Sequence, residues 1–264
     1  GRVTVSADGA LNSPQQITVT LTVLAPQPEF TSSGVVHAAT FRPGFVAPGQ
    51  ILTIFGRRLG PAEGVSFTLD PETQRLPVSL AGTRVSFDSV PAPLFYVSDS
   101  QVNLQVPNDV ATRSETVMTV KREGLSPAQT ELQVQDAVPG VFTVDGTRAA
   151  ALNQDFTLNT PENPAAPGSV VQLFLTGQGL TNIRVPAGVL APMEPPFPQP
   201  LLGVSLRMDA YEARVLFAGL APGFAGLMQV NAEVPRLVTP SDRVRVVVSV
   251  GRFQTTQPVT ISVR

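Results

Sequence analysis

A phrase of seven residues occurs twice in this chain, as Gln101-Val-Asn-Leu-Gln-Val-Pro107 and as Gln229-Val-Asn-Ala-Glu-Val-Pro235. A second pair of similar phrases precedes it, Ala47-Pro-Gly-Gln-Ile-Leu-Thr-Ile-Phe55 and Ala166-Pro-Gly-Ser-Val-Val-Gln-Leu-Phe174. Both pairs keep the same order along the chain, so the repeat extends well beyond one motif. At 264 residues the chain is long enough for two domains that each bury a core. The repeat therefore predicts two similar units in tandem.

The repeated units are predicted to consist of strands. Apolar and polar residues alternate with a period of two in many segments, among them 243–250 and 259–264, as expected for half-buried strands. The 26 Pro and 21 Gly are spread along the chain, which suits short strands joined by turns. Roughly seven strands per half at this spacing indicate a β-sandwich. We predict an all-β chain with one sandwich at 34–137 and a second at 138–264, joined without a flexible linker.

The first 24 residues belong to neither repeat. Residues 2–7 and 15–23 are predicted to form the two strands of a hairpin, followed by a stiff connector over 25–33 that begins Ala25-Pro-Gln-Pro28. An isolated hairpin is marginally stable in water. We expect it to dock on the first domain or to complete a sheet in the next subunit. Its candidate interaction surface is the alternating apolar set Ile17, Val19, Leu21 and Val23.

Composition excludes several classes of function. The formal net charge of -2 leaves no basic footprint for nucleic acid. The chain has no Cys, so disulfides, thiolate metal sites and cysteine nucleophiles are excluded. No run approaches the roughly 18 to 20 apolar residues of a membrane span, so we expect none. The chain begins Gly1-Arg2 without Met, from which we expect a mature product or a fragment of something longer.

Catalytic chemistry finds no support in the sequence. His37 is the only histidine, and it lies inside the strand-like run 35–41 with no nucleophile or orienting carboxylate near it in the sequence. Asp and Glu number 20, but no pair stands out for acid and base work. We expect a structural role for His37, no catalytic residues and no enzyme.

Two polar features remain to be assigned. Asn153, Asp155 and Asn159 concentrate oxygen ligands and could hold Ca²⁺, although Asn and Asp equally cap turns through their own backbone. We expect no cofactor, with calcium at these residues as the alternative. Asn103 and Asn231 occupy equivalent outward positions in the repeated phrase, and we expect each to bond a neighbouring loop.

A proline-rich loop at 186–200 occupies the place that 60–77 fills in the first half. One interpretation is a contact surface that proline orders in advance, so that binding costs little entropy. The alternative is an extended segment folded over its own sandwich, because apolar loop residues usually cover core. The candidate surface residues are Pro192, Met193, Pro195, Pro196, Phe197 and Pro198.

At the repeated phrases the chain resembles a known family, the Solibacter-type uncharacterised C-terminal domain of secreted acidobacterial proteins. The residues that carry the resemblance lie in 34–41, 47–56, 101–107, 151–168 and 216–235, so that it covers about 34–264. Each half is also similar to immunoglobulin-like IPT/TIG domains, and the first 24 residues resemble the last hairpin of a BACON-type domain. The resemblance implies export and an immunoglobulin-like Greek-key sandwich, but no established activity. His37 stands where this family carries Asn.

We therefore predict a non-enzymatic extracellular or cell-surface protein for structure, assembly or adhesion, built from immunoglobulin-like modules. Its predicted partner is a second copy, in a filament built by strand addition of the N-terminal segment, or another domain of a longer secreted chain. Nucleic acid and a membrane span are not expected. The alternative function is an accessory module of a larger secreted protein that binds polysaccharide or Ca²⁺. The absence of Trp and the presence of only two Tyr weigh against sugar binding, because sugars stack on such rings.

Overall fold

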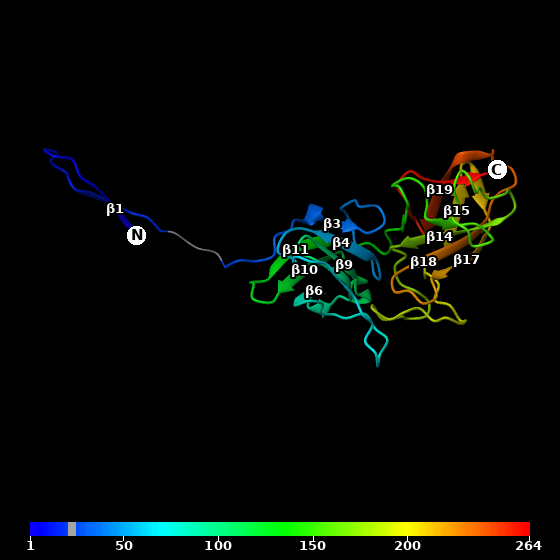
Figure 1. The fold of residues 1–264 in the computed structure, drawn as a ribbon, viewed down its shortest axis with the longest axis horizontal. Helices are drawn as coiled ribbons and strands as arrows, with labels where there is room; N and C mark the ends of the chain where they lie inside the picture. Colours follow the sequence, from blue (N-terminus) through cyan, green and yellow to red (C-terminus); the bar gives the residue numbers. More distant parts are fainter. Residues whose placement is uncertain (21–24) are drawn as a thin grey trace.

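A computed structural model describes residues 1–20 and 25–264, so Leu21 and Val23 lie outside the described residues. The chain is all-β: a short N-terminal hairpin is followed by two immunoglobulin-like sandwiches in tandem (Figure 1). This confirms the predicted fold class. Within the described residues, no helix is long and apolar enough to cross a membrane.

The first sandwich consists of two antiparallel sheets that enclose one apolar core. One sheet has the strand order β3-β4-β9-β8-β5, with β3 at Val35–His37, β4 at Ile51–Phe55, β5 at Val65–Ser66, β8 at Leu94–Val97 and β9 at Gln101–Gln105. The other has the order β11-β10-β6-β7, with β6 at Thr83–Phe87, β7 at Val90–Pro91, β10 at Glu115–Arg122 and β11 at Ala128–Gln133. Single 3-10 turns lie at Ser32–Gly34 and Asn108–Val110.

The second sandwich repeats this arrangement around its own core. Its first sheet has the order β12-β14-β18-β17 with β13 beside β14, where β12 is Gly140–Val141, β13 Ala151–Leu152, β14 Val170–Thr176, β17 Val215–Leu220 and β18 Met228–Glu233. Its second sheet has the order β16-β15-β19-β20 with β21 beside β19, where β15 is Val204–Met208, β16 Tyr211–Ala213, β19 Ser241–Val250, β20 Phe253–Gln254 and β21 Val259–Val263.

The repeated phrase forms the equivalent strands β9 and β18, whose apolar residues are completely buried. Within residues 1–20 and 25–264, no hydrogen bond joins the side chain of Asn103 or Asn231 to a neighbouring loop, so that prediction is wrong. Each Asn Oδ1 instead accepts a hydrogen bond from the Nε2 of the Gln two residues earlier, Gln101 at 2.9 Å and Gln229 at 2.8 Å. Side chains at positions i and i+2 share a face of a strand, which explains the pairing.

Hydrogen bonds join the two sandwiches across the junction. The Thr176 hydroxyl of the second sandwich accepts from the Ile51 backbone N–H of the first at 2.9 Å, and it donates to the Gly226 carbonyl of its own sandwich at 2.8 Å. The long loops of the two halves also meet, because the Leu76 N–H donates to the Gly188 carbonyl at 2.9 Å. These two inter-domain bonds, at Ile51 and at Leu76, involve buried or half-buried residues and tie the sandwiches together at two separate points.

The N-terminal hairpin pairs β1, Arg2–Val5, with β2, Gln15–Thr18. Both strands are shorter than predicted. Of the described residues 1–20, all are exposed except the half-exposed Ser13, and their hydrogen bonds stay inside the hairpin. The described hairpin is therefore not docked on the first sandwich, and Figure 1 shows it standing apart.

Candidate functional site

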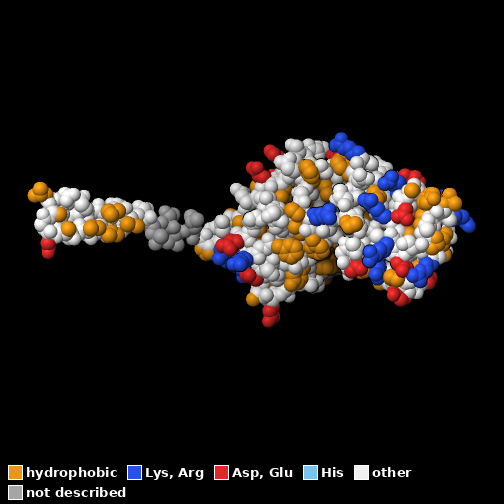
Figure 2. Space-filling view, turned by 90° about the horizontal axis from the view of Figure 1, so that it is seen from above, with side chains coloured by type: hydrophobic (Ala, Val, Ile, Leu, Met, Phe, Trp, Pro, Cys, Tyr) orange, Lys and Arg blue, Asp and Glu red, His pale blue; other side chains and the backbone are white. Residues whose placement is uncertain are grey.

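One face of the hairpin is apolar and uncovered. Val3 lies opposite Ile17 in the strand register, and Val5 and Val19 lie on the same face because side chains alternate along a strand. These four side chains are 46 to 56% exposed. Figure 2 shows hydrophobic side chains along the projecting arm. A two-stranded ribbon with such a face gains little stability until another surface covers it.

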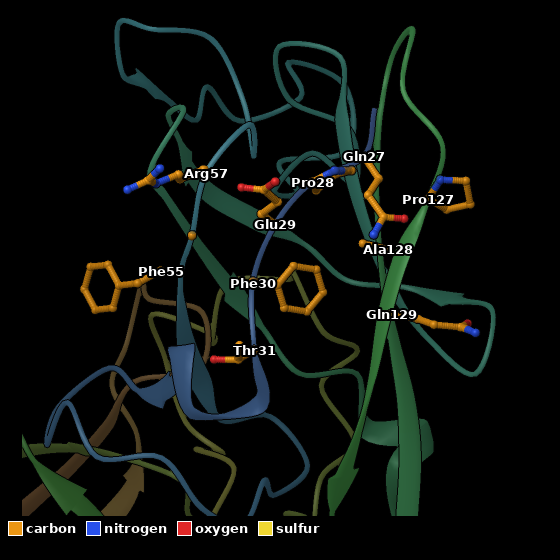
Figure 3. A pocket seen from close by; sticks show the side chains of 11 residues that line it. Gln27, Pro28, Glu29, Phe30, Thr31, Phe55, Arg57, Pro127, Ala128 and Gln129 are labelled. Carbon is orange, nitrogen blue, oxygen red and sulfur yellow. The ribbon is translucent and has the colours of Figure 1, made fainter. Parts of the chain in front are cut away.

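The first sandwich has a hollow of about 750 Å³ beside β11. One wall is the connector segment 27–31, which is held by a bond from the Arg57 N–H to the Glu29 carbonyl at 2.8 Å. The other wall is the start of β11 with Pro127, Ala128 and Gln129. Phe30 extends from the connector into the gap between the two walls (Figure 3).

A second hollow, of about 450 Å³, continues along the same strand. Its walls include Ser32 and Phe45 on one side and Glu131 and Leu132 of β11 on the other. Phe45 is 46% exposed and so offers an apolar wall to solvent. We call the two hollows together, from 27–33 and Phe45 across to 127–133, the lateral groove. It runs along the outer edge of β11, where, among the described residues, no strand pairs with β11 and the backbone bonds are those of Val46 at the end of the strand.

The proline-rich loop is divided between covered and exposed residues. Phe197 packs edge-on against Phe217 with ring centroids 5.7 Å apart, and Pro198 is buried with its carbonyl bonded to the Leu220 N–H at 2.8 Å. These two residues therefore cover their own sandwich. The remaining candidates are exposed: Pro192, Met193, Pro195 and Pro196.

The oxygen-rich stretch of the second sandwich is internally hydrogen-bonded. The fully buried Asn159 donates through Nδ2 to Asn153 Oδ1 and to the Ser262 carbonyl, both at 2.9 Å, and its Oδ1 accepts from the Ser262 N–H at 2.7 Å. Asp155 Oδ1 accepts from the hydroxyl and the N–H of Thr157, and these bonds lower the pKa of Asp155. The side-chain oxygens of Asn153 and Asn159 and one oxygen of Asp155, Oδ1, thus already accept hydrogen bonds. Among the residues that the structure describes, no group of three or more His, Cys, Asp or Glu is placed to hold a metal.

His37 lies at the junction between the sandwiches and is only 4% exposed. Its Nδ1 accepts a hydrogen bond from the Ala39 N–H at 3.0 Å, so Nε2 carries the proton and donates to the Val138 carbonyl at 3.0 Å. Burial away from water lowers the pKa of His37 to about 4, because the charged ring loses its hydration. Both ring nitrogens are used within the fold, which is the arrangement of a structural residue.

The structure thus keeps the two sets of predicted surface residues separate. The hairpin residues Ile17 and Val19 lie on the projecting arm, whereas the proline-rich loop packs on the second sandwich. Sequence reasoning missed the lateral groove, because its walls come from segments about a hundred residues apart. One signal was available: the segment 38–45 in the first half is much shorter than its counterpart 142–164 in the second.

Comparisons with known proteins leave the chain without a family assignment. No family model matches it, and no curated protein matches it. Among solved structures, the crystal structure of the I9–I11 tandem from titin is similar over 83% of this chain and 94% of that chain, with 7% sequence identity and a TM-score of 0.16. At these values the likeness carries no argument about function.

Proposed function

We propose that this chain is a non-enzymatic extracellular module that serves structure or assembly, and that copies associate by strand addition of the N-terminal hairpin. The observation that carries the proposal is the uncovered apolar face of a hairpin whose described residues are exposed and form hydrogen bonds only with one another. Strand addition covers such a face and supplies main-chain hydrogen bonds at the same time. Repeated from copy to copy, it builds the filament predicted from the sequence.

The polar residues considered for catalysis or calcium binding form hydrogen bonds within the fold. His37 bonds through both ring nitrogens, and the oxygens of Asn159 and Asp155 accept hydrogen bonds from nearby N–H and O–H groups. The immunoglobulin-like sandwich suits a structural or binding module, and the resemblance to secreted acidobacterial domains is the basis for proposing export. Adhesion would be one use of such an assembly.

The experiment compares the full chain with a variant that lacks residues 1–20, by multi-angle light scattering over a range of concentrations and by electron microscopy. We expect concentration-dependent association of the full chain and a monomer for the shortened one. The substitution Ile17→Asp should also abolish association, because it puts a charge on the apolar face. Thr4→Asp, on the polar face of the same hairpin, is the matched control. A full chain that stays monomeric at every concentration would refute the proposal.

A further inference from the structure

The last strands of the two sandwiches, β11 and β21, can be compared residue by residue. In each sandwich an upstream residue pairs in parallel with this strand: the Val46 N–H donates to the Gln133 carbonyl, and the Ala165 N–H donates to the Ser262 carbonyl, both at 2.9 Å. Val46 and Ala165 hold the same place, directly before the repeated Ala-Pro-Gly. Gln133 therefore corresponds to Ser262.

In the second sandwich the outer edge of this strand is occupied. The Thr260 N–H donates to the Thr147 carbonyl, and the Thr260 carbonyl accepts from the Ala149 N–H, both at 2.9 Å. Two residues further along, the Asn159 side chain bonds the backbone of Ser262. Chain from the segment 142–164 thus lies along β21 in the position of an additional strand.

In the first sandwich the same edge is open. Glu131 corresponds to Thr260, and its N–H and C=O face outward, because the alternate groups bond β10. Among the described residues, no backbone hydrogen bond reaches either group, nor those of Gln129. The segment 38–45, which would have to supply the cover, is too short to do so. Natural proteins usually cover or blunt an edge of this kind.

Strand β2 of the hairpin also has an edge whose backbone groups are unpaired among the described residues. Gly1 and Val19 exchange backbone hydrogen bonds, so in β2 the backbone groups of Gln16 and Thr18 face outward. Ile17 and Val19 alternate with them on the apolar face. The segment Gln15–Val19 is uncharged, and its outward groups are two residues apart, as are those of Gln129 and Glu131.

We propose that the segment Gln15–Val19 of a second copy adds as a strand to the outer edge of β11. Its apolar residues Ile17 and Val19 turn into the lateral groove, over Phe30, and its polar face continues the exposed face of β11. A hairpin seated in this way would bury on the order of 1,000 Å² in total, the lower bound for a specific interface. The inference rests on the proposed function and adds the site that receives the hairpin.

Cross-linking tests whether the contact joins two copies. Because the natural chain has no Cys, introduced thiols are the only ones present. In the proposed complex, Thr18 of one copy and Glu131 of the other lie on the same exposed face of the extended sheet. When the single variants Thr18→Cys and Glu131→Cys are mixed and oxidised, they should therefore form a disulfide-linked heterodimer, which mass spectrometry identifies. Thr18→Cys mixed with Glu212→Cys, on the exposed edge strand β16, is the control and should not link. A mixture of Thr18→Cys and Glu131→Cys that forms no more heterodimer than the control would overturn the proposal, as would a chain carrying both substitutions that forms the disulfide only within itself.

A proline tests the edge itself. Glu131→Pro removes an N–H that faces outward, so it leaves the β10 ladder intact while it blocks strand addition. We expect this variant to keep its circular dichroism spectrum and to raise the dissociation constant for self-association at least tenfold, whereas Glu131→Ala should change it little. If association persists unchanged in Glu131→Pro but is lost without residues 1–20, the hairpin acts elsewhere and the acceptor proposed here is wrong. If the intact chain never associates, the proposed function fails as well.

Discussion

Acidification should weaken this fold through His37, at the junction between the sandwiches. The neutral ring fits the site, because Nδ1 must stay unprotonated to accept from the Ala39 N–H. In the unfolded chain the pKa of His37 is near its ordinary value of 6.5, whereas in the folded chain burial lowers it to about 4. Between these two values the unfolded state binds a proton that the folded state does not.

The sign and size of the effect follow from this difference. Stability is complete above pH 6.5 and is lost progressively as the pH falls from 6.5 toward 4. At about 1.4 kcal/mol per unit, the loss of unfolding free energy approaches about 3 kcal/mol. The pKa values of Asp70, Asp88, Asp145 and Asp155 are lowered by hydrogen bonds from nearby residues, so their contribution is lost only as the pH falls below 3.8. The window of His37 is therefore separate from theirs.

The assay is urea unfolding followed by circular dichroism, at half-unit steps from pH 7.5 to 4. For the natural chain the midpoint should fall by about 1 to 3 M across the window, given slopes of about 1–3 kcal/mol/M. His37→Asn is the matched variant, because its Oδ1 can accept from the Ala39 N–H without titrating. Its midpoint should change little between pH 6.5 and 4. If the natural chain and His37→Asn lose stability equally over this window, the buried histidine is not the cause.

Three further outcomes are expected. Asn159→Ala leaves the Ser262 N–H unpaired in the core, so urea unfolding should show a loss of about 1–3 kcal/mol; a smaller loss than in the exposed Asp155→Ala would contradict this. Because the oxygens at this place already accept hydrogen bonds, removing calcium with a chelator should leave the melting temperature unchanged, whereas a clear drop would restore the calcium alternative. Thr176→Val keeps the side-chain shape but removes the inter-domain bond from the Ile51 N–H and the bond to the Gly226 carbonyl within the second sandwich, so we expect about 1–3 kcal/mol of destabilisation and a wider distribution of inter-domain angles in small-angle X-ray scattering; unchanged scattering profiles would show that other contacts fix the junction.

Periodicity was sufficient to predict the sandwiches, because apolar alternation reports directly on which residues are buried. The repeated phrase became β9 and β18, with Val102 and Val230 completely buried. The amphipathic hairpin was predictable for the same reason, and its candidate residues Ile17 and Val19 lie on the exposed apolar face.

The lateral groove and the partner of His37 could not be predicted, because both depend on contacts between residues far apart in the sequence. The lateral groove depends on whether an upstream segment reaches the last strand, and alternation carries no information about such a partner. The partner of His37 is the carbonyl of Val138, about a hundred residues away, and a carbonyl has no sequence signature. Asn103 was misassigned because its partner, Gln101, was nearer in sequence than the loops considered.

The hairpin leaves the body of the molecule at the rim of the groove, where the Ser126 N–H bonds the Pro26 carbonyl at 3.0 Å. In each copy, the hairpin that is donated and the edge of β11 that accepts a hairpin therefore lie at the same end of the molecule, on the first sandwich. Two copies that exchange hairpins satisfy both edges at once and complete a two-fold symmetric pair, with no free hairpin to recruit a third. A filament instead requires every copy to give its hairpin to one neighbour and to receive one from another. The symmetric pair and the filament use the same contact between hairpin and β11, and they differ only in the symmetry that relates the copies.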